Sequence, residues 1–121
     1  MMPRLDAETE VTSKDVSILH SHLVNLVAVT EKITRRVKAE EYYNLDSIIQ
    51  ERELWINKIE QWHLTFGSLV EGAVQFDNEE INIVRGQLET SSQRMQATMV
   101  EKSQELFAMV VSLQQHRFYQ Q

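Results

Sequence analysis

The strongest helical pattern in the chain lies at residues 16–37, which read VSILHSHLVNLVAVTEKITRRV. Apolar residues recur there at alternating spacings of three and four, which is the pattern of one face of an α-helix. The stripe consists of Val16, Leu19, Leu23, Leu26, Ile33 and Val37, with Thr30 in the same register. Val24 and Val27 widen it, as expected for a helix inside a bundle. This stretch therefore predicts a helix that needs neighbours.

The chain before this stripe is polar and has no periodicity, so we expect residues 1–12 to form a flexible N-terminus. Thr12 or Ser13 can cap the helix, and Asp15 in its first turn complements the helix dipole. Residues 13–121 are then expected to form a single helical-bundle domain.

A second helical pattern begins after residues 40–44, where the first one ends. Its apolar positions form two adjacent stripes, which together are too broad for a two-stranded seam. One stripe contains Leu45, Ile49, Ile56 and Ile59, and the other contains Ile48, Trp55 and Trp62. A helix of this kind packs on two sides, which again indicates a bundle.

Residues 64–76 contain Gly67 and Gly72 among apolar residues, and we interpret them as a turn followed by a short helical segment. Asp77 and Glu80 have the spacing of a capping box, which predicts the start of a last helix. The fold expected is all-α, an antiparallel bundle of three long helices with a short fourth helical segment in the 64–76 connector.

The last helix is predicted to be longer than its neighbours. At 1.5 Å per residue it extends roughly 60 Å, against roughly 35 to 40 Å for the first two helices. Part of it must therefore project, fold back or be covered by something else. The polar interval at residues 89–94 places Ser91 at the core register, so the sequence leaves the continuity of the helix open.

Composition excludes several classes of function. Eighteen acidic residues against twelve basic ones give a net charge of −6, which disfavours nucleic-acid binding. The basic cluster at residues 32–38 is explained by its place at the end of a helix, where cations meet the negative end of the dipole. The absence of cysteine, of a signal peptide and of a long apolar run predicts a cytoplasmic protein that does not enter a membrane.

No constellation of residues predicts catalysis, a metal or a cofactor. The histidines lack the spacing of three or four that a helical metal pair needs; they are His20, His22, His63 and His116. The carboxylates lie in polar stretches, where water keeps them ionised. We therefore expect no enzyme activity.

The methionines inside the chain all lie in the predicted last helix, as Met95, Met99 and Met109. Flexible thioethers are common on surfaces that accept a partner. Because this helix is also the one that outlasts its neighbours, we expect its face from Leu88 to Leu113 to bind a partner.

Three stretches resemble the small flagellar type III export chaperones of the FlgN and FliT type. They are residues 40–45 followed by Glu51-Arg52-Glu53-Leu54, the helix start at residues 77–80, and the chain end Arg117-Phe118-Tyr119. The resemblance extends from about Ser17 to Tyr119.

The resemblance implies that the chain binds the C-terminal segment of a late flagellar substrate, such as the filament cap or a hook-associated protein. It further implies delivery to the export ATPase and the export gate, with Tyr119 matching the family's gate-docking tyrosine. The partner-binding residues expected from helix and resemblance together are Leu88, Met95, Met99, Leu106, Met109, Leu113 and Tyr119.

Two alternatives remain open at this point. A histidine phosphotransfer domain, also a small helical bundle, would use His20 or His22 as its phosphate acceptor. A structural bundle or coiled-coil homodimer would instead pair the long last helix with its own copy.

Overall fold

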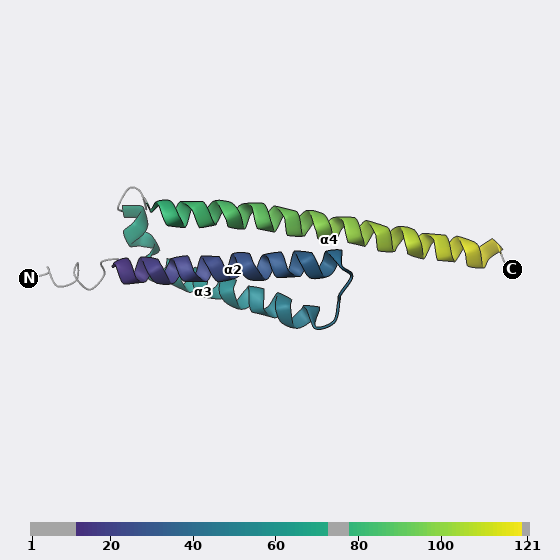
Figure 1. Cartoon of the computed structure of the whole chain (residues 1–121), viewed down its shortest axis with the longest axis horizontal. Coiled ribbons are helices and arrows are strands. Elements are labelled where there is room, and N and C mark those ends of the chain that lie inside the picture. Colours follow the sequence, from purple (N-terminus) through teal and green to yellow (C-terminus); the bar gives the residue numbers. More distant parts are fainter. Residues whose placement is uncertain (1–11, 73–77, 120–121) are drawn as a thin grey trace, which may run out of the picture.

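The computed structural model of the chain is all-helical, and it describes the backbone of residues 12–72 and 78–119 and the side chains of residues 12–66 and 78–116. Its helices are α2 (Ser13–Lys38), α3 (Leu45–Gly72) and α4 (Glu79–Tyr119). Helices α2 and α4 run in the same direction, and α3, which lies between them in the sequence, runs in the opposite direction (Figure 1). The expected all-α architecture of three long helices is thus confirmed, whereas the predicted flexible N-terminus lies outside the described residues except for Thr12.

The expected short fourth helical segment is not seen. Helix α3 continues without a break through Leu64 and Gly67 and ends at Gly72, and residues 73–77 lie outside the described part of the chain. A single glycine in a helix costs only about 1 kcal/mol relative to alanine. The rings of Trp62 and Phe66, one turn apart, lie 4.9 Å from each other and support the helix at this point. In Figure 1 the last turns of α3 rise toward the start of α4.

Side-chain caps fix where α2 and α4 begin. The Thr12 hydroxyl accepts from the Asp15 backbone N–H at 3.1 Å, and the Asp15 carboxylate accepts from the Thr12 backbone N–H at 3.0 Å. This reciprocal capping box confirms Thr12 as the cap of α2. At the start of α4, Asn78 Oδ1 accepts from the Ile81 N–H at 3.0 Å, so Asn78 takes the capping role, while Asp77 lies outside the described residues.

Helix α2 is the centre of the molecule, and its apolar stripe contributes to two core clusters. The first cluster lies near the start of α2 and joins Leu19, Leu23, Trp62, Ile81 and Val84. The second lies nearer its end and joins Leu26, Val29, Ile33, Val37 and Ile48. The register predicted from residues 16–37 is therefore confirmed, except that Val24 is 43% exposed and lies outside the core.

Polar side chains interrupt this core. Thr30, Thr34, Ser91 and Thr98 are all buried. Thr30 Oγ1 accepts from Arg52 Nε on α3 at 3.0 Å, and Ser91 Oγ on α4 donates to the Glu31 carboxylate at 3.1 Å. These bonds connect all three helices and satisfy polar groups that would otherwise destabilise the core. Helix α4 is continuous through residues 89–94, and Ser91 occupies the core register that its spacing indicated.

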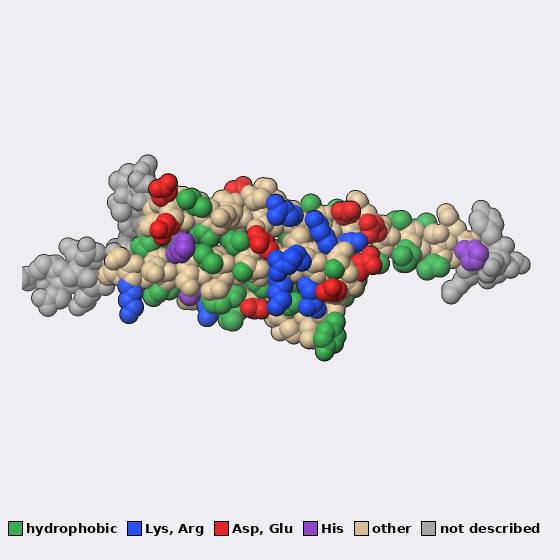
Figure 2. Space-filling view, viewed as in Figure 1, with side chains coloured by type: hydrophobic (Ala, Val, Ile, Leu, Met, Phe, Trp, Pro, Cys, Tyr) green, Lys and Arg blue, Asp and Glu red, His purple; other side chains and the backbone are tan. Residues whose placement is uncertain are grey.

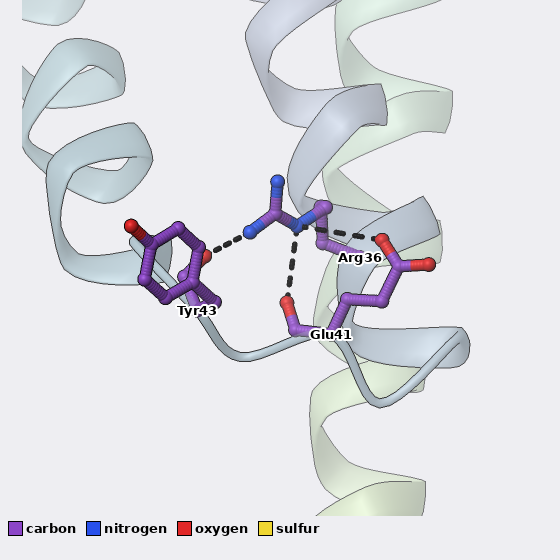
Figure 3. Close-up of polar contacts among 3 residues, drawn as sticks. All are labelled: Arg36, Glu41 and Tyr43. Carbon is purple, nitrogen blue, oxygen red and sulfur yellow. Dashed lines mark hydrogen bonds and ion pairs between the residues drawn. The ribbon is translucent and has the colours of Figure 1, made fainter.

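The turn between α2 and α3 is organised by Arg36 (Figure 3). Its Nε donates to the Glu41 carbonyl at 3.0 Å, and its Nη2 donates to the Tyr43 carbonyl. The Glu41 carboxylate lies 3.8 Å from the same guanidinium. Glu40 and Asn44 both have a φ of 58°, so the chain turns twice through the left-handed region, and the Arg36 contacts hold that shape.

Helix α4 is longer than its neighbours and projects beyond them, as Figure 1 shows. Among the residues whose side chains the structure describes, the last ion pair between α4 and the rest of the molecule is that of Lys102, whose Nζ lies 3.1 Å from Glu40 Oε1. From Ser103 to His116 every residue of α4 is exposed except Val111, which is half-buried. We call the part of α4 from Ser103 to Tyr119 the overhang; of the three possibilities left by the length mismatch, projection is the one found.

Candidate partner-binding groove

An open groove of about 720 Å³ runs along α4 on the side that faces α3. We call it the α4 groove. It begins beside the core and ends on the overhang. Its lining residues are Arg52, Ser92, Met95, Gln96, Met99, Val100, Ser103, Gln104 and Phe107.

The floor of the α4 groove is held in place by the core. Met95 and Met99 are half-buried and pack against the second core cluster while they line the groove. Val100 and Phe107 stand out from the helix, with 50% and 71% of their surface exposed. The groove therefore has two half-buried methionines at its base and an apolar edge that is at least half exposed.

Arg52 is the charged side chain in the lining of this groove. It comes from the middle of α3, where its Nε is fixed by the hydrogen bond to buried Thr30. Among the residues that the structure describes, the ion pairs involve Arg36 and Lys102 and leave Arg52 without a carboxylate. A half-buried cation of this kind favours a partner group that carries negative charge.

The overhang continues the apolar surface away from the rest of the molecule, and Figure 2 shows hydrophobic side chains along it. Leu106, Met109, Val110 and Leu113 are each more than half exposed, and no charged residue occurs in residues 106–115. Contiguous exposed apolar surface on this scale is typical of a binding site.

The sequence-predicted binding residues fall into three places. Leu88 is half-buried and packs against both core clusters, so it serves the fold. Met95 and Met99 lie in the α4 groove, and Leu106, Met109 and Leu113 lie on the overhang. Tyr119 is the last residue of α4, and its side chain lies outside the described residues.

Sequence reasoning missed most of the groove lining, including Arg52, Val100, Ser103 and Phe107. A signal was present, because Val100 and Phe107 are seven residues apart and therefore share one face of the helix. It was overlooked because this face lies beside the core stripe and is half polar, with Ser92, Gln96 and Ser103 among its members.

His22, one of the two candidate phosphate acceptors, packs against α3 through its ring. Its Nδ1 is buried without a hydrogen-bond partner, and its ring lies 5.6 Å from that of Trp55. Lys58 Nζ lies 4.5 Å from the centre of the same Trp55 ring. Burial, and then the nearby Lys58 charge, lower the pKa of His22 below its ordinary value. The buried Nδ1 of His22 is therefore not available to accept a phosphate.

His20 lies in a different place, beside a cavity of about 250 Å³ between the starts of α2 and α4. Residues 12–66 and 78–116 contain no group of three histidine or acidic side chains placed to hold a metal ion. Within the described part of the chain, none of the helices combines the length and the apolar character needed to cross a membrane.

Comparisons of the chain with protein-family models, with curated proteins and with solved structures give no match. The geometry of the α4 groove and the overhang, together with the sequence resemblance, is therefore the basis for assigning a function.

Proposed function

We propose that the chain is an export chaperone that binds an amphipathic helix in the α4 groove, and that its cargo is the C-terminal segment of a late flagellar substrate. The observation that carries the binding role is the open apolar groove between the overhang and Arg52. The flagellar cargo, the filament cap or a hook-associated protein, follows from the resemblance to the FlgN and FliT type.

The proposed recognition is helix-in-groove packing. An amphipathic helix places apolar side chains at i, i+3, i+4 and i+7 into a groove, and its burial supplies the free energy of binding. Met95 and Met99 can adapt their side chains to different cargo surfaces, which suits a chaperone with several substrates. A carboxylate on the cargo helix can pair with Arg52, which adds specificity to the apolar contact.

The resemblance and the groove involve the same part of α3. Of the four residues Glu51-Arg52-Glu53-Leu54, Arg52 is the one that lines the groove. The delivery step, with the export ATPase and the export gate as further partners, rests on the resemblance alone. Tyr119 at the end of α4 is the residue that would dock at the gate.

A cargo without tertiary structure must be ordered when it binds, and this ordering lowers the net affinity. A chaperone benefits from that loss because it must release its cargo for export. The proposed mechanism therefore predicts a gain of helicity on binding and a modest affinity.

The test uses the full chain and synthetic C-terminal segments of the filament-cap and hook-associated proteins of the same organism. We expect titration calorimetry to show binding and circular dichroism to show added helix. Val100→Asp and Phe107→Asp should abolish binding without unfolding the protein, because both side chains are at least half exposed.

Ile83→Asp is the matched control, because Ile83 is an exposed apolar residue of α4 outside the α4 groove, 55% exposed. This variant should bind the segments as the wild type does. If none of the segments binds, the proposed cargo is wrong; if Phe107→Asp binds as well as Ile83→Asp, the proposed groove is wrong.

A further inference from the structure

We infer that a second hollow of the molecule, between α2 and α4, is a binding site for a phosphate monoester. This inference goes beyond the proposed chaperone role, because none of the residues that line this hollow also lines the α4 groove. It rests on three properties of the hollow: where its cations come from, how little they are neutralised, and the polar character of the lining.

The hollow has a volume of about 290 Å³, and the second half of α2 and the middle of α4 form its two sides. We call it the cationic hollow. Its lining residues are Glu31, Thr34, Arg35, Lys38, Ser91 and Arg94. Figure 2 shows Lys and Arg side chains gathered over the second half of α2 and the part of α4 beside it.

The base of the cationic hollow is fixed by the fold. Thr34 and Ser91 are buried, with 5% and 4% of their surface exposed. Thr34 Oγ1 donates to the Thr30 carbonyl at 3.1 Å. Ser91 Oγ donates to the Glu31 carboxylate, also at 3.1 Å. Both hydroxyl hydrogens are therefore used within the chain, and the three cations supply the donors that a ligand would meet.

These cations exceed what the fold requires. Arg35 and Lys38 lie in the last turn of α2, where the helix dipole amounts to only about half a negative charge, and Arg36 in the same turn already supplies a cation. Arg94 lies far from either end of α4, so no helix dipole accounts for it. Within the part of the chain whose side chains the structure describes, the ion pairs involve Arg36 and Lys102 and none of the three lining cations.

Charge selects the ligand. Three cations and one carboxylate, that of Glu31, give the lining a net charge of +2 in a chain whose net charge is −6. A phosphate monoester carries about −1.5 to −2 charges at pH 7 and presents three acceptor oxygens, so it matches both the charge and the three donor side chains. A carboxylate has one charge and two oxygens, and it would leave one of the cations without a partner.

The rest of the lining disfavours larger ligands. Among the described residues, those that line the cationic hollow include no aliphatic and no aromatic side chain, so it offers no ring on which a nucleotide base could stack. Its volume lies close to the lower limit of about 300 Å³ for small-molecule pockets, which leaves room for a phosphate and the first atoms attached to it. The ligand is therefore a phosphate carried by a small molecule or by a phosphorylated side chain.

Titration calorimetry on the full chain tests the site with three probes at one ionic strength. They are glucose 6-phosphate, a short peptide that contains phosphoserine, and the same peptide with glutamate in place of the phosphoserine. We expect a phosphate probe to bind, and the glutamate peptide to bind about tenfold or more weakly than the phosphoserine peptide, because it has fewer charge-assisted hydrogen bonds.

The two phosphate probes distinguish the source of the ligand. Binding of both supports a site that recognises the phosphate alone, and binding of only one supports that carrier, the small molecule or the phosphorylated side chain. If neither phosphate probe binds, or if the glutamate peptide binds as well as the phosphoserine peptide, the inference is wrong.

Arg94→Gln removes one of the three cations and should raise the dissociation constant of the bound phosphate probe about tenfold, because a hydrogen bond between charged groups is lost. Arg85→Gln is the matched control, since it makes the same change at an arginine of α4 outside the cationic hollow, and it should bind the probe as the wild type does. Both arginines are exposed, so both variants should keep the fold, which circular dichroism checks. Equal weakening in the two variants would reveal general attraction to surface charge and would overturn the site.

Backbone amide chemical shifts give the location of the bound probe. Saturation with it should move the amide signals of residues 31–38 and 91–94 and leave those of the overhang in place. Shifts confined to other parts of the chain would place the phosphate elsewhere and contradict the inference.

Discussion

The ammonium group of Lys102 lies 3.1 Å from the carboxylate of Glu40, and this contact joins α4 to the turn that ends α2. Lys102 also lies 3.1 Å from Glu105, one turn further along α4. The hydrogen bond to Glu105, and then the one to Glu40, raise the pKa of Lys102 above its ordinary value. From Ser103 to His116 the residues of α4 are exposed except for half-buried Val111, so Lys102 marks the boundary between the part of α4 that packs in the fold and the overhang.

The boundary predicts that the overhang can be altered without loss of stability. Met109→Gln and Leu113→Gln should change the free energy of unfolding by no more than about 0.5 kcal/mol, because both side chains are more than half exposed. Leu19→Ala, in contrast, should cost about 2–5 kcal/mol, because Leu19 is fully buried in the first core cluster. Urea unfolding followed by circular dichroism measures all three. If the overhang variants lost as much free energy of unfolding as Leu19→Ala does, the overhang would have to fold together with the core.

Trp62 connects the far end of α3 to the start of α2, because its Nε1 donates to the Asp15 carbonyl at 2.9 Å. Trp62→Phe keeps an aromatic ring in the core but removes this donor and some volume, and should cost about 1–3 kcal/mol. Trp55→Phe is the control: Trp55 is half-buried and its indole N–H makes no hydrogen bond within the described residues. The ranking fails if Trp55→Phe is the more damaging variant in urea unfolding.

The stability of the chain should depend on the shape of the Arg36 side chain as well as on its charge. Lysine cannot present two donors in the planar arrangement that reaches the Glu41 and Tyr43 carbonyls together, so Arg36→Lys should destabilise the chain by about 1–2 kcal/mol. Amide hydrogen exchange should accelerate in the turn at residues 39–44. Arg35→Lys next to it, at an exposed position, should leave both measurements unchanged.

Burial of His22 predicts a pH dependence of stability. Because the pKa of His22 is lowered in the folded chain, the unfolded chain takes up a proton first as the pH falls. The stability that neutral His22 contributes is therefore fully present above the ordinary histidine pKa of about 6.5. It is lost as the pH falls through the pKa that His22 has in the folded chain. The pKa of His63 is lowered in the same direction by burial and by Arg85, so it adds to the effect.

His22→Met should reduce this loss by removing one of the two groups. The free energy of unfolding of wild type and variant, measured from neutral to mildly acidic pH, provides the check. An identical slope in the two proteins would contradict the proposed role of His22 packed on Trp55.

Local patterns in the sequence predicted the helices well. The stripe of α2 was readable because its apolar spacing matches a helix turn by turn, and Leu19, Leu23 and Ile33 are indeed buried. The cap at Thr12 was readable because a capping box involves residues only three positions apart. The break expected at residues 64–76 was wrong at its start, because glycine lowers helix propensity only slightly and Trp62 packs with Phe66 across the turn.

The α4 groove could not be predicted from the sequence with its actual lining. Arg52 belongs to α3 and Phe107 to α4, and 55 positions of chain separate them, so only the packing of helices brings them to one surface. The buried Thr98 was missed for a related reason, since a lone threonine in a helix is equally suited to either face until its neighbours are known.

The sequence by itself determined that the chain is three long helices, that α2 is capped at Thr12 and that the last helix is too long for its partners, because each of these depends on neighbours within a few residues. Only the tertiary structure decided that α4 projects instead of folding back, and that its polar-apolar face beside the core opens toward Arg52. Both outcomes depend on which parts of the α2 surface contact α3 and which contact α4. These contacts join residues far apart in the sequence, so no local stretch of residues specifies them.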